Sequence, residues 1–292
     1  TVYPFTMVFE TEVSTSNTAF LQPWSPMEGY LVSVQKSNMT ITYKPELKLK
    51  VKEINFSGQA TIEKTETASS ISYAAKNVVA RKREELSPGF AKVFPIVYFA
   101  LENFSLENVE GTATNWAEFG KWYYQSLLAD TEEIPVETQA KIKQLVGDEK
   151  NPITIAKLIY KYVQEKTRYV SVQVGIGGWK PMLAKEVDKL GYGDCKALTN
   201  YTRALLKTVG VDSYYTVVYA GRDDTKDLQE DFASVQGNHV ILTLPTDKGF
   251  VWLECTSQVQ PFGFQGDFTD DRNVLLIKPD GGSIVKTKTF TE

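Results

Sequence analysis

The sequence has very few of the side chains that bind metals or form cross-links. Its 292 residues include two cysteines, Cys195 and Cys255, and a single histidine, His239. Two cysteines without a CxxC spacing do not make a disulfide framework. One histidine and two distant cysteines do not supply the four ligands of a structural zinc site. The sequence therefore predicts neither a metal centre nor a disulfide-dependent fold.

Other motifs are also missing. No apolar run approaches the ~18 residues that a membrane-spanning helix needs, and the chain, which begins at Thr1, contains no signal peptide. The net charge is −4, and the one tight basic cluster, Arg81-Lys82-Arg83, is followed at once by two glutamates. This pattern argues against nucleic-acid binding, which needs a broader basic face. The Gly175-Ile176-Gly177-Gly178 stretch matches no phosphate-binding loop and predicts a turn.

The composition is that of a globular protein with two predicted domains, at residues 1–112 and 113–292. Apolar residues make up 42% of the chain and aromatic residues 12%. In the first part, Leu49 and Val51 alternate with lysines, which is typical of a half-buried strand, and residues 55–62 and 70–79 continue in that style. Short strands without long helical patterns predict an antiparallel β-sandwich. The expected fold class is α+β.

Helical patterns begin near residue 113. Asn115, followed three residues later by Glu118, is typical of a capped helix start. A second helix is predicted after Pro135, and Asn151-Pro152 predicts a third, because proline suits the first helical position. That helix should end near Thr167, before an extended segment at residues 168–172.

Cys195 falls at the predicted start of another helix, which runs to Gly210. Asp194 is a favourable N-cap residue, so the cysteine lies in the first helical turn. The free N–H groups and the dipole of a helix N-terminus stabilise a thiolate and can donate to an oxyanion. The alternative is a buried cysteine that acts as a small apolar residue.

The segment from 237 to 256 predicts a β-hairpin with a turn at residues 245–248. If Leu244 pairs with Gly249, His239 lies opposite Glu254, and cross-strand partners have Cβ atoms roughly 4.5–5.5 Å apart. The carboxylate can then accept the proton of one ring nitrogen and leave the other to face a thiol. Cys255 should point to the opposite face, into the core.

The order of these residues resembles the transglutaminase-like superfamily, which is related to the papain fold. The resemblance covers roughly residues 115–262 and is greatest to bacterial, Bacteroidetes-type proteins with an N-terminal β-sandwich of unknown function. It implies a helix-borne Cys195 nucleophile packed on an antiparallel sheet, His239 as general base and acid, and Glu254 as third member, where the superfamily usually has Asp. Gln173 is the candidate side-chain donor of the oxyanion hole, and Trp179 is the second candidate.

The function that this resemblance implies is that of a cysteine peptidase or amidase, with a peptide or protein substrate and no cofactor. An amine acyltransferase and a catalytically degenerate binding module are the alternatives. Some transglutaminases need calcium, but the acidic stretches Asp223-Asp224 and Asp267 to Asp271 lack an EF-hand pattern. Relatives of this type are usually exported, which implies the periplasm or cell envelope. The sequence does not determine the oligomeric state.

Overall fold

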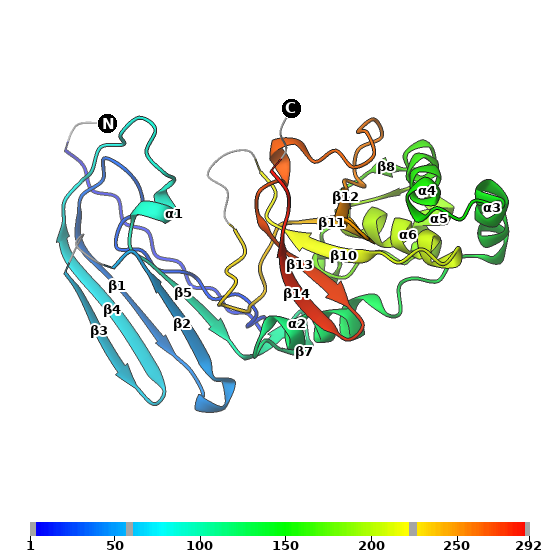
Figure 1. Ribbon diagram of the computed structural model, residues 1–292. Coiled ribbons are helices and arrows are strands. Elements are labelled where there is room, and N and C mark those ends of the chain that lie inside the picture. Colours follow the sequence, from blue (N-terminus) through cyan, green and yellow to red (C-terminus); the bar gives the residue numbers. More distant parts are fainter. Residues whose placement is uncertain (1–3, 57–60, 222–226, 290–292) are drawn as a thin grey trace.

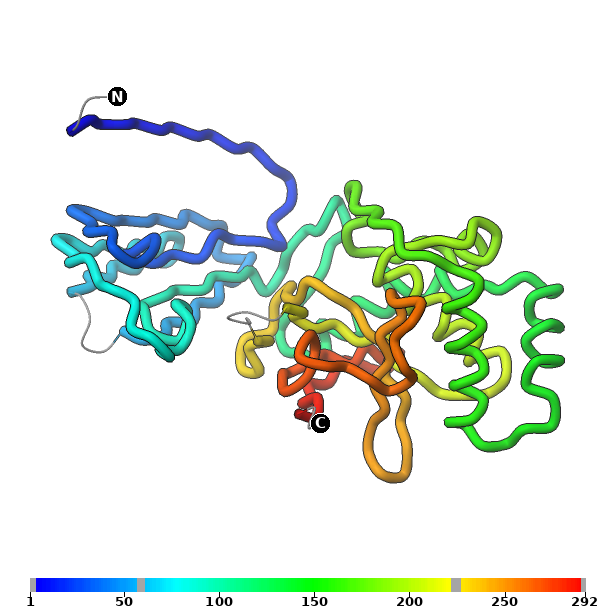
Figure 2. The backbone as a smooth tube through the Cα atoms, turned by 90° about the horizontal axis from the view of Figure 1, so that it is seen from above, coloured from blue at the N-terminus to red at the C-terminus, as the bar shows by residue number. Residues whose placement is uncertain are grey.

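The computed structural model describes residues 4–56, 61–221 and 227–289 and has an α+β fold (Figure 1). The N-terminal half consists mainly of strands, whereas helices and a larger sheet form the C-terminal half. Figure 2 shows the two halves side by side, with the first described residues, from Pro4 on, extending along the N-terminal sheets. The predicted fold class is confirmed. No helix in the described part of the chain is long and apolar enough to cross a membrane.

Two antiparallel sheets in the N-terminal half share one core, to which Ile71, Tyr73, Val97 and Phe99 contribute. The first sheet has the order β1-β4-β3, and the second pairs β2 with β5. The bounds are β1 Val34–Thr42, β2 Leu49–Ile54, β3 Ile62–Thr67, β4 Ser70–Val78 and β5 Ile96–Leu101, with a 3-10 turn at Pro45–Leu47 and the short helix α1 at Phe90–Val93.

The strand predicted over residues 55–62 is wrong at its described residues Asn55, Phe56 and Thr61. β2 ends at Ile54, and Asn55 has a φ of 58°, a left-handed conformation that ends a strand. β3 begins only at Ile62, and residues 57–60 lie outside the described part of the chain. The strand predicted from residue 70 is confirmed as β4.

A hairpin leads from the N-terminal sheets into the first long helix. It consists of β6 (Asn103–Leu106) and β7 (Val109–Thr112), and α2 (Trp116–Tyr123) follows. Asn115 caps α2 as predicted, because its side chain accepts a hydrogen bond from the Glu118 N–H. One π-helical turn, Tyr124–Leu128, extends α2.

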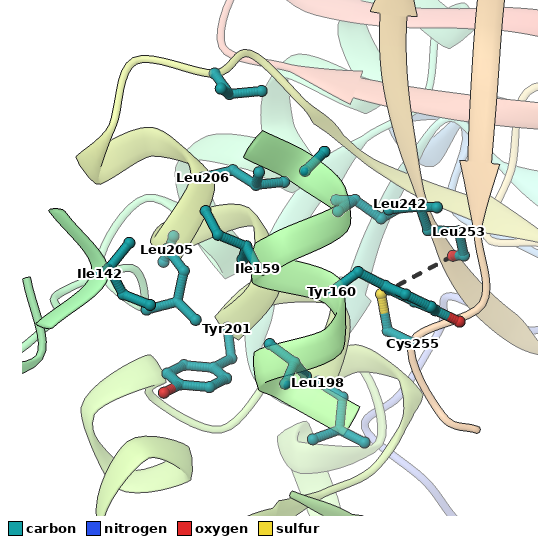
Figure 3. Close-up of a cluster of buried hydrophobic side chains, with 14 of the residues drawn as sticks. Ile142, Ile159, Tyr160, Leu198, Tyr201, Leu205, Leu206, Leu242, Leu253 and Cys255 are labelled. Atoms are coloured by element: carbon teal, nitrogen blue, oxygen red, sulfur yellow. Dashed lines mark hydrogen bonds between the residues drawn. The ribbon is translucent and has the colours of Figure 1, made fainter. Parts of the chain in front are cut away.

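The C-terminal half is built on a five-stranded antiparallel sheet with the order β12-β11-β10-β13-β14. Helices α3 to α6 cover one face, and α2 packs on β13 and β14. The strands are β10 Tyr214–Val218, β11 His239–Thr246, β12 Gly249–Leu253, β13 Asn273–Lys278 and β14 Gly281–Lys286, and the helices are α3 Val136–Val146, α4 Pro152–Lys166, α5 Ala184–Leu190 and α6 Cys195–Thr208. Figure 3 shows the core in which α4 and α6 meet β11 and β12.

The predicted start of α4 is confirmed, and the segment after it is shorter than expected. The Asn151 side chain accepts hydrogen bonds from the N–H groups of Ile153 and Thr154. Of the extended segment predicted at residues 168–172, only β8 (Arg168–Tyr169) pairs, in parallel with β9 (Tyr192–Gly193). Two further 3-10 turns lie at Gly175–Gly178 and Gly266–Phe268.

The predicted register of the β11–β12 hairpin is wrong by two residues. Thr246, not Leu244, pairs with Gly249, so the loop contains two residues instead of four. Side chains alternate between the faces of a strand with a period of two. A slip of two residues therefore leaves every side chain on its predicted face, and this is why His239 and Glu254 still share a face.

The contact between α2 and β14 predicts an effect on stability. A Cβ on Gly120 would lie 2.2 Å from Gly282 Cα and 2.3 Å from Gly282 N, which is impossible without moving backbone. We expect Gly120→Ala to lower the free energy of unfolding by about 1–3 kcal/mol, as overpacking does, which outweighs the gain of up to ~1 kcal/mol in helix propensity. Urea denaturation measures the difference. Gly29→Ala is the control because a Cβ there meets nothing within 4 Å. Equal midpoints for the two variants would contradict the prediction.

Candidate active site

Cys195 is the first residue of α6, as the capping pattern predicts. Asp194 Oδ1 accepts a hydrogen bond from the Ala197 N–H at 3.0 Å, and its Oδ2 pairs with the ammonium group of Lys196. The cysteine is 6% exposed. Because the first N–H groups of a helix have no intrahelical acceptor, the backbone at Cys195 is able to donate to an anion in front of the helix. Asp194 thus fixes the helix start on which this geometry depends.

His239 begins β11 and contacts Glu254, which follows the last residue of β12. Their side chains are joined by a hydrogen bond of 2.7 Å between Nε2 and Oε2, and the histidine side chain is 11% exposed. The other carboxylate oxygen of Glu254 accepts from the N–H and the hydroxyl of Thr256, at 2.9 and 2.6 Å. Both oxygens of the acid are therefore engaged, and Nδ1 is the ring nitrogen left for another partner.

The electrostatic environment favours a charged imidazole paired with a carboxylate. Burial lowers the pKa of His239, but its hydrogen bonds to Cys195 and Glu254 and the negative charge of Glu254 outweigh it and raise that pKa to about 9. Burial raises the pKa of Glu254, but the hydrogen bonds from His239 and Thr256 outweigh it, so the net pKa lies below its usual value. The raised pKa of His239 and the lowered pKa of Glu254 both keep this pair ionised at neutral pH.

A cavity of about 460 Å³ brings the predicted residues together. Cys195 and His239 line it, and so do Gln173 and Trp179, the two candidates for the oxyanion hole. Gln173 is exposed, and Trp179 is held from behind because its carbonyl accepts a hydrogen bond from the Tyr123 hydroxyl at 3.0 Å. The structure thus brings all four side chains to one cavity, and their roles stay predictions.

Other contacts at the site did not follow from the sequence. The Tyr160 hydroxyl, on α4, donates to the Glu254 carbonyl at 2.7 Å and so fixes the acid's backbone. Phe268 packs edge-on against the His239 ring, with centroids 5.4 Å apart. Only Thr256 carried a usable signal, because a hydroxyl two residues after an acid often bonds to it locally. Tyr160 and Phe268 reach the site through tertiary packing alone.

The backbone before His239 is tightly constrained. Gly237 has a φ of 96°, and a Cβ there would lie 2.4 Å from Val217 Cγ1, so only glycine fits. The Asn238 side chain then bonds to both the N–H and the carbonyl of Ala220, at 2.7 and 3.0 Å. These contacts attach the start of β11 to the end of β10 and set the position of the imidazole.

Cys255 is separate from this site, as predicted. It is free, buried and packed in the core between α4, α6 and β12, whereas Cys195 belongs to a different apolar cluster (Figure 3). Burial raises the pKa of the Cys255 thiol to about 12. A thiol of this kind is protonated and unreactive at neutral pH.

Within residues 4–56, 61–221 and 227–289, the structure has no group of three or more His, Cys, Asp or Glu side chains that could hold a metal ion. The acidic pair Asp223-Asp224 lies outside the described residues.

Comparison with known families gives a match that covers the helices and the hairpin of this site. Residues 139–257 match the model of the Transglutaminase-like superfamily. The matched segment contains Cys195, His239 and Glu254, together with α4 to α6. Comparison with proteins of curated function gives no match.

Two solved structures resemble the chain as a whole. A putative protease from Parabacteroides distasonis is 13% identical with a TM-score of 0.56, and the alignment covers 93% of this chain but 48% of that protein. The chain thus spans about half the length of that protein, and the similarity extends the fold beyond the transglutaminase-like core. A putative cysteine protease from Cytophaga hutchinsonii is 12% identical with a TM-score of 0.36, over 92% of this chain and 82% of that one.

The ion pair predicts how the imidazole titrates. Since the chain has one histidine, its Hε1 proton gives a single assignable NMR signal. We expect a midpoint near pH 9, and a midpoint lower by about one unit or more in Glu254→Gln, because the opposite charge that favours imidazolium is gone. Because the folded protein holds the proton of His239 more tightly than the unfolded chain does, this proton stabilises the fold. The stabilisation is complete below pH ~6.5, the usual pKa of histidine, and is lost as the pH rises through about 9.

Glu165→Gln is the matched control for this titration, because Glu165 is 68% exposed on α4 and pairs only with Lys161 among the described contacts. Its midpoint should equal that of the wild type. A wild-type midpoint near 6.5, unchanged in Glu254→Gln, would show that no ion pair forms.

Proposed function

We propose that the chain is a cysteine peptidase or amidase in which Cys195, His239 and Glu254 act as a catalytic triad. The observation that carries this proposal is the shared cavity. Cys195 at the start of α6 and His239 on β11 line the same cavity. Glu254 is hydrogen-bonded to Nε2 of the imidazole, which leaves Nδ1 for the thiol. This is the arrangement that nucleophilic catalysis by a thiol requires.

The first half of the proposed reaction forms a thioester. The Cys195 thiolate attacks the carbonyl carbon of an amide, and the oxyanion accepts hydrogen bonds from the Cys195 N–H and from Gln173. The imidazolium of His239 then gives its Nδ1 proton to the leaving nitrogen, and the C–N bond breaks. Glu254 holds the ring through Nε2 and stabilises its positive charge.

The second half hydrolyses the thioester. His239, now neutral, takes a proton from a water molecule, whose oxygen attacks the thioester carbonyl. Collapse of the intermediate releases the carboxylic acid and regenerates the thiolate–imidazolium pair. An amine that replaced this water would give transfer in place of hydrolysis. The exposure of Gln173 at the cavity supports access of water.

Alkylation tests the activation of Cys195. We expect iodoacetamide at pH 7 to label Cys195, which lines the cavity, and to leave Cys255 unlabelled, because that thiol is packed in the core and its raised pKa keeps it protonated. His239→Ala should slow the labelling of Cys195 by roughly tenfold or more, because the thiolate loses its imidazolium partner. Mass spectrometry of tryptic peptides measures both sites in one sample, so Cys255 serves as the internal control. Equal labelling of both cysteines, independent of His239, would falsify the proposal.

Product analysis separates hydrolysis from acyl transfer. A peptide mixture incubated with the protein yields new carboxylic acids if water is the acceptor, and amide adducts if added methylamine competes. The Cys195→Ala variant is the blank for both products. Activated labelling of Cys195 with adducts as the dominant product would assign the chain to the acyltransferases, and the peptidase proposal would be wrong.

A further inference from the structure

A second cavity, of about 620 Å³, lies between the N-terminal sheets and the C-terminal half. Its lining comes from residues 19–23, from β2, α1 and β5 in the N-terminal half, from Tyr219, and from the segment 227–236. In Figure 1 that last segment, between β10 and β11, runs on the side of the C-terminal half that faces the N-terminal sheets. The cavity therefore exists only because both halves of the chain contribute to it.

This interdomain cavity adjoins the cavity that contains Cys195 and His239. Val235 and Gln236 line both, so one short stretch of chain forms a common wall. The two cavities also meet at an aromatic pair, because Phe20 lines the interdomain cavity, Trp179 lines the other, and their rings lie 4.8 Å apart. An extended peptide bound at Cys195 thus lies next to the interdomain cavity, and only the stretch with Val235 and Gln236 separates the two.

The lining of the interdomain cavity is rich in aromatic rings. Tyr98 comes from β5, Phe20 from the segment before the first strand, and Tyr219 and Phe232 from the C-terminal half. Burial raises the pKa of Tyr98 and of Tyr219, so both phenols are neutral at physiological pH. Neutral rings pack favourably on another aromatic ring in offset or edge-to-face contact. The cavity is large enough for such a side chain, because ligand pockets begin at roughly 300 Å³.

The wall between the cavities is held in place by hydrogen bonds. The Gln236 side chain accepts from the Gln229 N–H at 3.0 Å and donates to the Phe232 carbonyl at 2.6 Å. From the N-terminal sheets, the Lys50 ammonium group donates to the Ala233 carbonyl, and Lys52 pairs with Asp231. The cavity is thus a preformed feature of this segment.

We propose that the interdomain cavity is a substrate subsite, which takes an aromatic side chain of a peptide whose scissile bond lies at Cys195. This inference rests on the proposed function for its choice of a peptide. It gives the N-terminal sheets a role in specificity, because they supply the wall that the transglutaminase-like core lacks.

Affinity selection with the full chain tests the subsite. The Cys195→Ala variant is incubated with a solution library of random octapeptides with blocked termini, and retained peptides are sequenced by mass spectrometry. We expect Phe, Tyr or Trp to be enriched at one position by roughly tenfold or more, since apolar pockets discriminate by roughly 10- to 200-fold. Adding Ala91→Trp should abolish this enrichment, because Ala91 lines the cavity and an indole would fill it.

Ala140→Trp is the matched control, since Ala140 is exposed on α3 and touches neither cavity. Tyr98→Ala is a second test variant in case Ala91→Trp does not fold, and it should weaken the enrichment by removing one ring of the wall. Retention without an aromatic preference, no retention, or the same preference in Ala91→Trp overturns the subsite.

Iodoacetamide labelling of the chain that retains Cys195 keeps the two proposals apart. Normal, His239-dependent labelling without aromatic enrichment leaves the catalytic proposal standing and removes the subsite. Aromatic enrichment that depends on Ala91, with an unreactive Cys195, does the reverse and assigns the chain a peptide-binding role.

Discussion

Helix α6 is buried on all sides over residues 195–206, and the position of Cys195 depends on this burial. A buried polar group without a partner costs roughly 1–3 kcal/mol, so the polar side chains of α6 determine how the helix packs. Asn200 donates to the carbonyl and the hydroxyl of Thr131, and Thr202 bonds back to the Leu198 carbonyl. The apolar side chains fill the cores on either side. A rotation of α6 would break several of these contacts, and this fixes where Cys195 meets the cavity.

The glutamate at position 254 is explained by the register of the hairpin. Continuing the observed pairing by one residue sets Glu254 opposite Ile241, two residues from His239. Diagonal neighbours on one face lie roughly 7–8 Å apart, against 4.5–5.5 Å for direct partners. The additional methylene of glutamate helps to span that diagonal, and the 2.7 Å hydrogen bond is made. Glutamate in place of the superfamily's usual aspartate is therefore consistent with an intact contact and is not in itself a sign of degeneracy.

The features of the fold that could be predicted from the sequence are those set by contacts between residues close together in the chain. Asn115, Asn151 and Asp194 placed three helix starts correctly, because a capping side chain bonds to the backbone two or three residues away. The hairpin register was wrong by two residues because alternation defines a face and not a pairing partner. Tyr160 and Phe268 had no signal at all, since their contacts with the site arise from packing between distant segments. The domain boundary at residue 112, the cell-envelope location and the roles of Gln173 and Trp179 stay predictions.

The alternation of apolar residues and lysines along β2 predicts the strand correctly but gives the wrong environment for its lysines. The pattern of Leu49 and Val51 with flanking lysines correctly predicts a strand, and it suggests a polar face in water. Lys50 instead turns toward the C-terminal half, where its ammonium group donates to the carbonyls of Ala113 and Ala233. Burial lowers the pKa of Lys50, and the nearby Glu102 opposes this only in part. The Lys50 ammonium group stays in this half-buried position because it donates to two carbonyls, that of Ala113 just before α2 and that of Ala233. The polar face of β2 is therefore an interface, and through Lys50 it anchors the segment whose Val235 and Gln236 line the cavity with Cys195.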